Sequence, residues 1–223
     1  AELGDECEQT IQAIVLLGKI LTQGPQGGGG GGDEAQKLPA QALHLSRSTL
    51  GNEHEVTIGC IGAMAYVHFM KGERDLAERM VRETIELSTR VHGADDVRTL
   101  GCMANLGQAL TVLGRPHEAK AILERVVDKR RELEPREEGT CTAMISLASV
   151  LDDLQEFDRA VALYKEAYTG MVETLGAHSR EALSAESNLA TCLAHAGRME
   201  EALQLHQKNL QTSTETFGEQ HAK

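Results

Sequence analysis

Apolar side chains recur along this chain at steps of three and four residues, and short polar segments interrupt them at regular intervals. Such spacing is typical of one face of an α-helix. Within residues 99–132, a first stripe consists of Leu100, Met103, Leu106, Leu110 and Leu113, and a second of Ala119, Ile122, Leu123, Val126 and Val127. Gly114-Arg115-Pro116 separates the stripes, and glycine commonly ends a helix while proline suits the first turn of the next. The pattern predicts two antiparallel helices joined by a tight turn.

The same unit recurs with a period of 42 residues, shortened once to 41. Three columns of equivalent residues keep this register: Ala77, Ala119, Ala160 and Ala202; Ala65, Gly107, Ala148 and Ala190; Met64, Leu106, Leu147 and Leu189. Helices approach closely only where side chains are small, so the alanine and glycine columns indicate helix crossings, with leucines filling the space beside them. The period predicts helix pairs near residues 57–90, 99–132, 140–173 and 182–215.

A more divergent pair is predicted over residues 5–49, because the segment Leu3–Ile11 resembles the segment Leu50–Ile58. Between its two helices we expect a flexible loop over residues 24–32, which ends in six consecutive glycines. No Lys-Ser or Lys-Thr follows this loop, so it is not a phosphate-binding loop. Residues 217–223 resemble the start of a further repeat. We therefore expect the chain to be a piece or a processed form of a longer array.

Helix pairs with these columns resemble tetratricopeptide repeats. Leu50-Gly51-Asn52-Glu53-His54, Asn105-Leu106-Gly107 and Asn188-Leu189-Ala190, together with the long period, are similar to the kinesin-light-chain subtype. The resemblance implies an all-α fold, an α-solenoid that winds as a right-handed superhelix of about five antiparallel helix pairs in a single array over residues 1–223. Each unit buries its apolar faces by stacking on its neighbours, and about three or more units are needed for that.

The resemblance also implies where a ligand binds, since the first helix of each pair lines the concave face of such an array. The partner-binding residues expected on that face are Tyr66, Phe69, Asn105, Gln108, Ser146, Ser149, Asn188 and Thr191. In the family, an asparagine at the position of Asn105 and Asn188 hydrogen-bonds the backbone of an extended peptide. The alternative is that these asparagines bond a neighbouring helix. The projected face is nearly free of Lys and Arg, so we expect a neutral or apolar ligand, with Tyr66 and Phe69 as its anchor.

Composition and charge narrow the functional classes. The formal net charge of −12 opposes binding to nucleic acid. No apolar run is long enough to span a membrane. Five scattered cysteines without a CxxC pair suit a reducing compartment, so we expect a cytoplasmic protein. Nine histidines form no HExxH or matched ligand pair, and we expect no metal and no cofactor. No nucleophile, dinucleotide or Walker motif is present, so we expect no enzymatic activity.

Three functions fit this sequence. The first is a non-catalytic scaffold that binds a protein or peptide reversibly in the concave groove. The second is a permanent structural subunit of a large assembly, held by helix edges and loops. The third is the repeat region of a larger signalling ATPase whose catalytic part lies outside this chain. Fold alone does not choose among them.

Overall fold

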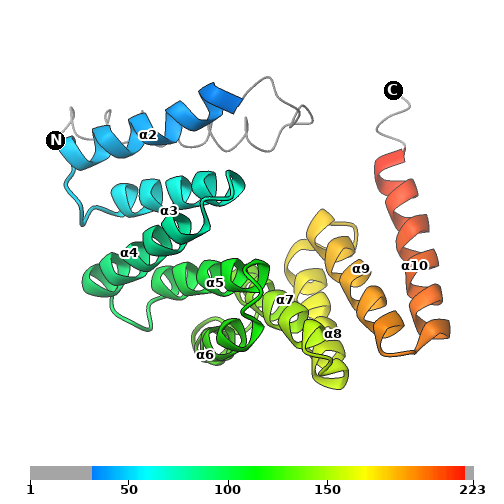
Figure 1. Cartoon of the computed structure of the whole chain (residues 1–223). Helices are drawn as coiled ribbons and strands as arrows, with labels where there is room; N and C mark the ends of the chain where they lie inside the picture. Colours follow the sequence, from blue (N-terminus) through cyan, green and yellow to red (C-terminus); the bar gives the residue numbers. More distant parts are fainter. Residues whose placement is uncertain (1–31, 219–223) are drawn as a thin grey trace. The chain divides into compact units, whose positions relative to one another are not determined.

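The computed structural model describes residues 32–218 (Figure 1). Over this part of the chain it consists of α-helices and one closing π-helical turn, Thr214–Gly218, and contains no strand. The helices are α2 (Gly32–Thr49), α3 (Glu55–Met70), α4 (Arg74–His92), α5 (Val97–Val112), α6 (Pro116–Leu133), α7 (Glu138–Asp153), α8 (Phe157–Leu175), α9 (Arg180–His195) and α10 (Met199–Ser213). The prediction of an all-α repeat of antiparallel helix pairs is confirmed.

Several predicted features lie outside the described residues. The first helix of the pair over residues 5–49, the loop residues 24–31 and the end of the chain, residues 219–223, belong to this group. Gly32, the last residue of the predicted loop, begins α2. The single array over residues 1–223 therefore stays a prediction.

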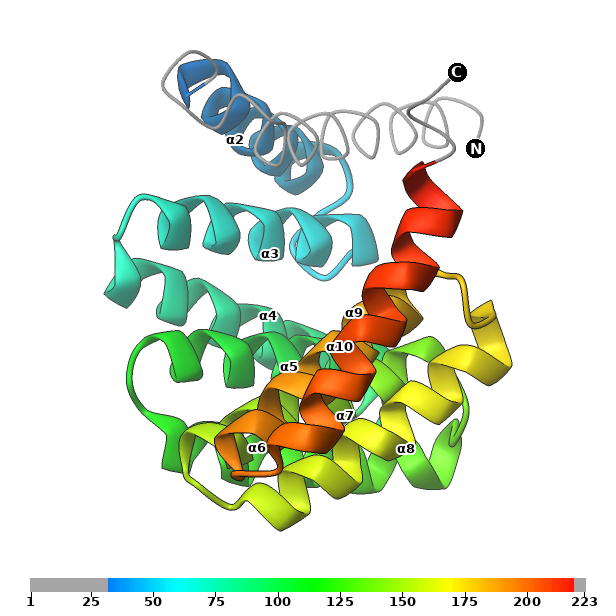
Figure 2. The same ribbon diagram turned by 90° about the vertical axis from the view of Figure 1, so that its right-hand side faces the viewer.

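The chain divides into two compact units, residues 1–102 and residues 103–223, and the division falls within α5. In the first unit, α2 packs on α3 and α3 packs on α4. In the second, α6 packs on α7, α7 on α8, α8 on α9 and α9 on α10. The paired helices run side by side in two perpendicular views, as α3 with α4 and α9 with α10 show (Figures 1 and 2).

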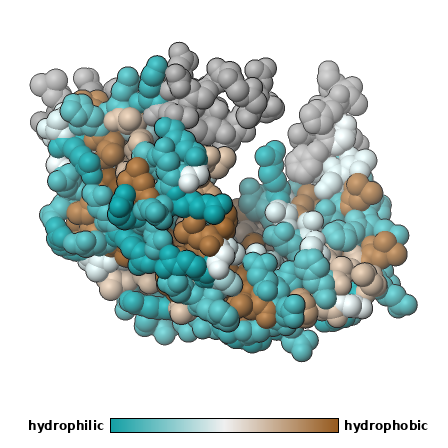
Figure 3. Space-filling model, viewed as in Figure 1, coloured by the Kyte–Doolittle hydropathy of each residue, from teal (hydrophilic) through white to brown (hydrophobic). Residues whose placement is uncertain are grey.

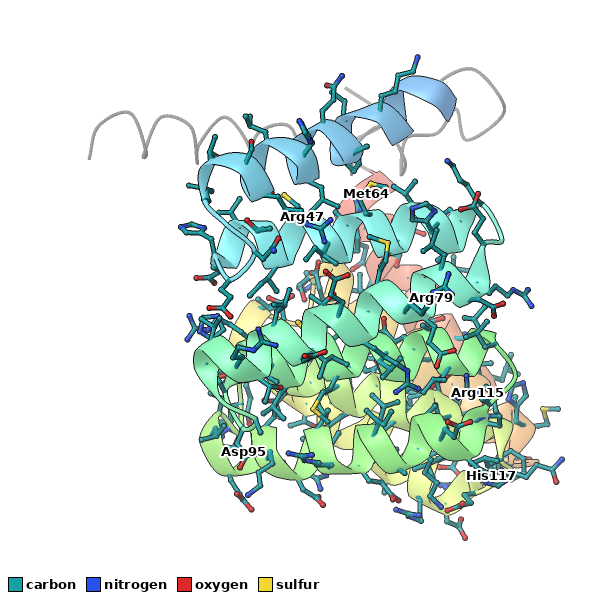
Figure 4. The ribbon with its side chains drawn as sticks, turned by 60° about the vertical axis from the view of Figure 1, so that its left-hand side comes forward. Arg47, Met64, Arg79, Asp95, Arg115 and His117 are labelled. Carbon is teal, nitrogen blue, oxygen red and sulfur yellow. The ribbon has the colours of Figure 1, made fainter. Side chains whose placement is uncertain are left out.

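The core of the first unit joins its helices through aliphatic side chains. Its buried members are Ala42, Leu43, Ile58, Cys60, Ile61 and Leu87, and the partly buried Leu45, Leu50, Val56, Met64 and Met80 pack against them. Met64 and Arg47 lie where α3 faces α2 (Figure 4). Arg47 reaches on to Glu83 of α4, with 2.8 Å between Nη2 and Oε1.

In the second unit the small residues of the repeat columns are buried at the helix crossings. Ala148, Ala160 and Ala190 are fully buried, and Ala202 nearly so. The closest approach is at Gly107, where a Cβ would lie 2.6 Å from Cγ of Leu123. Because real carbon atoms do not come this close, only glycine fits between α5 and α6 at this level.

The turn inside each pair repeats a left-handed residue. Gly72, Gly114 and Gly197 take positive φ values of 78°, 73° and 78°, as glycine does without steric cost. The equivalent residue of the pair α7–α8 is Gln155, which has a φ of 62°. The turn geometry is therefore kept even where glycine is absent.

Candidate functional site

In the first unit, the predicted anchor residues Tyr66 and Phe69 lie near the C-terminal end of α3. Tyr66 is 42% exposed and Phe69 is half-buried. Met70 follows them and is 62% exposed, although the sequence pattern did not single it out. These three side chains place exposed or half-exposed apolar surface at one end of α3. Next to them, Nδ1 of His68 lies 2.5 Å from Oε2 of Glu73.

In the second unit, the predicted polar residues occupy equivalent positions on successive first helices. Gln108 on α5, Ser149 on α7 and Thr191 on α9 are all exposed. Each is one repeat from the next, because the intervals are 41 and 42 residues. Periodicity alone was therefore enough to identify an outward-facing polar column.

The two asparagines expected to bind a peptide backbone carry unpartnered amides. Asn105 is exposed and Asn188 is half-buried. Among residues 32–218, neither side chain makes a hydrogen bond. Both amides therefore keep their donors and acceptors for a ligand, and neither is used to join two helices.

Ser146 and Gln108 are joined to each other. The Gln108 Nε2 group donates to Ser146 Oγ over 2.8 Å, and that hydroxyl donates to the carbonyl oxygen of Thr142 over 3.0 Å. Ser146 is only 9% exposed. The structure thus places Ser146 as a link between α5 and α7, and it leaves less of this hydroxyl for a ligand than the sequence predicted.

The two remaining hydroxyls differ in their surroundings. The Thr191 hydroxyl donates to the carbonyl oxygen of Ser187 on its own helix over 3.0 Å, as threonine commonly does within helices. Ser149 hydrogen-bonds the phenol of Tyr164 on α8, a residue that is only 4% exposed. Both hydroxyls can still accept a hydrogen bond from a ligand.

An Asp–His contact that the sequence did not reveal closes one end of this surface. Nδ1 of His195 on α9 lies 2.7 Å from Oδ2 of Asp152 on α7. His195 is 54% exposed at its side chain, whereas Asp152 is 14% exposed. The two residues are 43 positions apart, so only the packing of α7 near α9 brings them together. Nδ1 donates to this carboxylate in the ring forms that carry a proton on Nδ1.

The Cys192 thiol and the Tyr164 phenol near this contact both have raised pKa values. Burial raises the pKa of the Cys192 thiol to about 12, and the Asp152 carboxylate adds to the shift. Burial also raises the pKa of Tyr164 to about 12. A cysteine nucleophile needs a lowered pKa, so the Cys192–His195–Asp152 grouping does not have the properties of a catalytic thiol site.

The first helices of the second unit carry mostly acidic groups. Residues 103–112 of α5 contain no charged residue, and α7 contains Glu138, Asp152 and Asp153 but no Lys or Arg. On α9, Glu186 is buried, and its Oε1 pairs with Nζ of Lys208 at 2.6 Å. Arg180 and Glu181 at the start of α9 balance each other, so the net acidic charge of these helices lies on α7 and opposes an acidic ligand there.

Residues 32–218 contain neither a metal-binding cluster nor a membrane-spanning helix. No group of three or more His, Cys, Asp or Glu side chains there is placed to hold a metal ion. In the same residues, no helix is long and apolar enough to cross a lipid bilayer.

Solved structures with the same fold are similar over nearly the whole chain. Two structures of a Podosopora anserina protein with a kinesin light chain designation and nearly identical TPR-like repeats match with TM-scores of 0.72 and 0.70, each at 19% identity over 94% of this chain and 97% of that one. BtubC (BKLC) from P. vanneervenii matches with a TM-score of 0.72 and 12% identity, over 96% and 92% of the two chains. MamA matches with a TM-score of 0.53 and 16% identity, over 96% of each chain. At these identities the likeness concerns the fold.

The sequence comparisons point to the same repeat. No curated protein sequence matched the chain. The family model described as tetratricopeptide repeat matches residues 61–132, 99–171 and 181–223, which together make up more than half of the sequence. The kinesin-light-chain likeness expected from the sequence agrees with the structural neighbours. The chain belongs to the tetratricopeptide repeat family.

Proposed function

We propose that this chain is a non-catalytic scaffold that binds a protein or peptide segment on the exposed face of its first helices. The observation that carries the proposal is the pair of unpartnered amides, Asn105 and Asn188, beside the exposed column of Gln108, Ser149 and Thr191 within residues 32–218. An amide donates and accepts at once, which matches the alternating N–H and C=O groups of an extended peptide backbone.

The ligand side chains in this proposal are neutral or apolar. The acidic charge of α7, with Glu138, Asp152 and Asp153 and no Lys or Arg, disfavours Asp and Glu in the ligand. Tyr66, Phe69 and Met70 of the first unit provide a separate apolar surface for a partner. Aromatic and methionine side chains are common anchors at protein interfaces. We place the protein in the cytoplasm on the basis of its free cysteines, of which Cys60, Cys141 and Cys192 are buried.

A pull-down from native extract tests the amides directly. The bait is the full chain, compared with an Asn105→Ala/Asn188→Ala variant and with a control, Asn52→Ala/Gln204→Ala, that removes two exposed amides elsewhere. We expect specific partners, read by mass spectrometry, to be lost from the first variant and kept by the control. Helical circular dichroism should be equal for all three chains.

Partners that stay bound to the variant would argue against this binding site. If the same partners stay bound to the Asn105→Ala/Asn188→Ala variant in fixed ratio, the first-helix face is not the binding site. The alternative of a permanent structural subunit, held by other surfaces, would then describe the chain better. The exposed leucines of α10 favour that alternative, because they offer a helix edge for such contacts.

A further inference from the structure

The three first helices of the second unit differ in what they offer to a ligand backbone. Asn105 on α5 and Asn188 on α9 hold the same position of the repeat, and Ser146 on α7 holds it between them. Within the described part of the chain, neither asparagine side chain makes a hydrogen bond. Ser146 is only 9% exposed, accepts a hydrogen bond from Gln108 and donates one to the carbonyl oxygen of Thr142. The two outer helices therefore present amides, whereas the middle helix has its polar group engaged.

The rest of α7 offers no replacement for the missing amide. Its sequence contains no Asn and no Gln. Ile145 is half-buried beside Ser146, and Thr142 and Ser149 are exposed. The Thr142 hydroxyl donates to a carbonyl oxygen of its own helix, and Ser149 is hydrogen-bonded to the buried Tyr164. A ligand that crosses α7 thus meets an apolar side chain and hydroxyl oxygens, but no group that binds both the N–H and the C=O of a residue as an amide does.

The spacing of the helices determines how much ligand backbone separates the two amides. α5 and α7 are neighbours, because the Gln108 side chain bonds Ser146 directly, and α7 in turn contacts α9. The axes of packed helices lie about 8–10 Å apart, so two such steps span about 16–20 Å. An extended chain rises by about 3.3 Å per residue, and a polyproline II chain by about 3.1 Å. The residues that meet Asn105 and Asn188 are therefore about five or six positions apart in an extended ligand.

Charge and hydropathy favour uncharged side chains in the part of the ligand that crosses α7. This helix ends in Asp152 and Asp153 and has no Lys or Arg, so it repels acidic side chains. In the view of Figure 3, apolar side chains of the second unit form separate patches among hydrophilic ones. A small apolar side chain that packs on Ile145 suits such a surface, and contacts to the ligand backbone then contribute more to binding than a large side-chain anchor does.

We infer that the ligand is an extended segment that contains proline between two residues held by their backbone. Asn105 and Asn188 each bind the N–H and the C=O of one held residue, and the residues between these two cross α7 without a backbone bond to Ser146. Proline lacks an N–H, so it fits between the held residues but not at either of them. Its fixed φ keeps the free segment extended, which lowers the entropy cost of binding. This ligand class rests on the proposed function, because it uses the same two amides.

A proline scan of bound peptides tests the ligand class. The full chain selects ligands from an immobilised library of random dodecapeptides without Asp or Glu, and each selected peptide is remade with Pro at every position in turn. We expect two positions, about five or six residues apart, at which Pro weakens binding about tenfold, because a backbone hydrogen bond to an amide is lost. Pro at the positions between them should leave the affinity unchanged or raise it. Fluorescence anisotropy of the labelled peptides measures these affinities.

Two variants assign each sensitive position to one amide. In Asn105→Ala, Pro at one of the two positions should no longer weaken binding, and in Asn188→Ala the same should hold for the other position. Gln204→Ala removes an exposed amide on α10 and should leave both positions sensitive. Helical circular dichroism should be equal for all of these chains, because neither asparagine side chain bonds another residue within the described part of the protein.

The possible results distinguish the ligand class from the proposed function. A third sensitive position between the two, or a separation other than about five or six residues, overturns the ligand class while a scaffold that depends on Asn105 and Asn188 remains. Sensitivity to Pro along the whole peptide also overturns it, and indicates a helical ligand. If no peptide is selected, or if the selected peptides bind Asn105→Ala/Asn188→Ala as tightly as the wild type, the proposed function fails together with the ligand class.

Discussion

Gln155 has a backbone conformation that glycine takes at the equivalent position of three other helix pairs. Its φ of 62° lies in the left-handed region, where a side chain costs roughly 1–2 kcal/mol. We predict that Gln155→Gly stabilises the chain by about 0.5–1 kcal/mol, because this strain outweighs the extra freedom of glycine in the unfolded state. Urea unfolding followed by circular dichroism measures the change. Gln204→Gly, inside α10, should instead destabilise by about 1 kcal/mol.

Asp96 supplies a pH-dependent contact at the start of α5. Its carboxylate accepts hydrogen bonds from the side chain and the backbone N–H of Arg98, which lower its pKa from 3.8 to about 2. A lowered pKa in the folded state stabilises above the unfolded value and is lost as pH falls. We predict that Asp96→Asn lowers the melting temperature at pH 7. The difference from the wild type should shrink between about pH 4 and pH 2. A constant difference over that range would contradict an ionic contribution.

Single residues also show where prediction from the sequence stopped. The exposure of Gln108, Ser149 and Thr191 followed from their place in a regular period. The pairing of Asp152 with His195 did not, because it depends on the side-chain conformations of two helices that are distant in sequence. Likewise, the link through Ser146 depends on which way the Gln108 amide turns. The repeat period predicts which positions are exposed. Hydrogen bonds between repeats depend on side-chain conformations, which only the folded structure shows.

At the scale of helices, Gly107 sets how closely α5 and α6 approach. A methyl group there would meet Leu123 at 2.6 Å, so the helices would have to separate. We predict that Gly107→Ala costs about 1–3 kcal/mol, as overpacked cores do. Adding Leu123→Ala should recover part of that loss. Gly59→Ala, in α3, is the matched control, since a Cβ there meets nothing within 4 Å. It should be neutral or stabilising by up to about 1 kcal/mol.

The attachment of α10 to α9 depends on a buried carboxylate. Glu186 is 1% exposed and receives hydrogen bonds from Lys208 and Asn209. We predict that Lys208→Met costs about 1–2 kcal/mol, because it leaves a buried charge with the neutral Asn209 amide as its remaining donor. The double variant Glu186→Gln/Lys208→Met should recover most of the loss. Chemical unfolding of all three chains measures these differences, and an additive double variant would contradict the coupling.

At the scale of the whole chain, the fold was predictable because the same pattern of apolar and small residues occurs in several successive repeats. The columns of Ala160 with Ala202, and of Ala148 with Ala190, predicted crossings that the structure buries. The division of the chain within α5 could not be predicted from the sequence, because residues 97–112 keep the apolar stripe throughout. A period describes one unit and its neighbour, and it contains no information about where a series of units is divided.

The uneven burial of α7 and α10 has a consequence for motion. Nine residues of α7 are buried, from Thr140 to Leu151, whereas Ala202 alone is buried in α10. Local opening needs little energy where few side chains are buried, so backbone amides of α10 should exchange with deuterated solvent well before those of α7. A partner that covers the exposed leucines of α10 would slow that exchange. The rate of hydrogen exchange in a single helix would then report whether the end of the unit is covered.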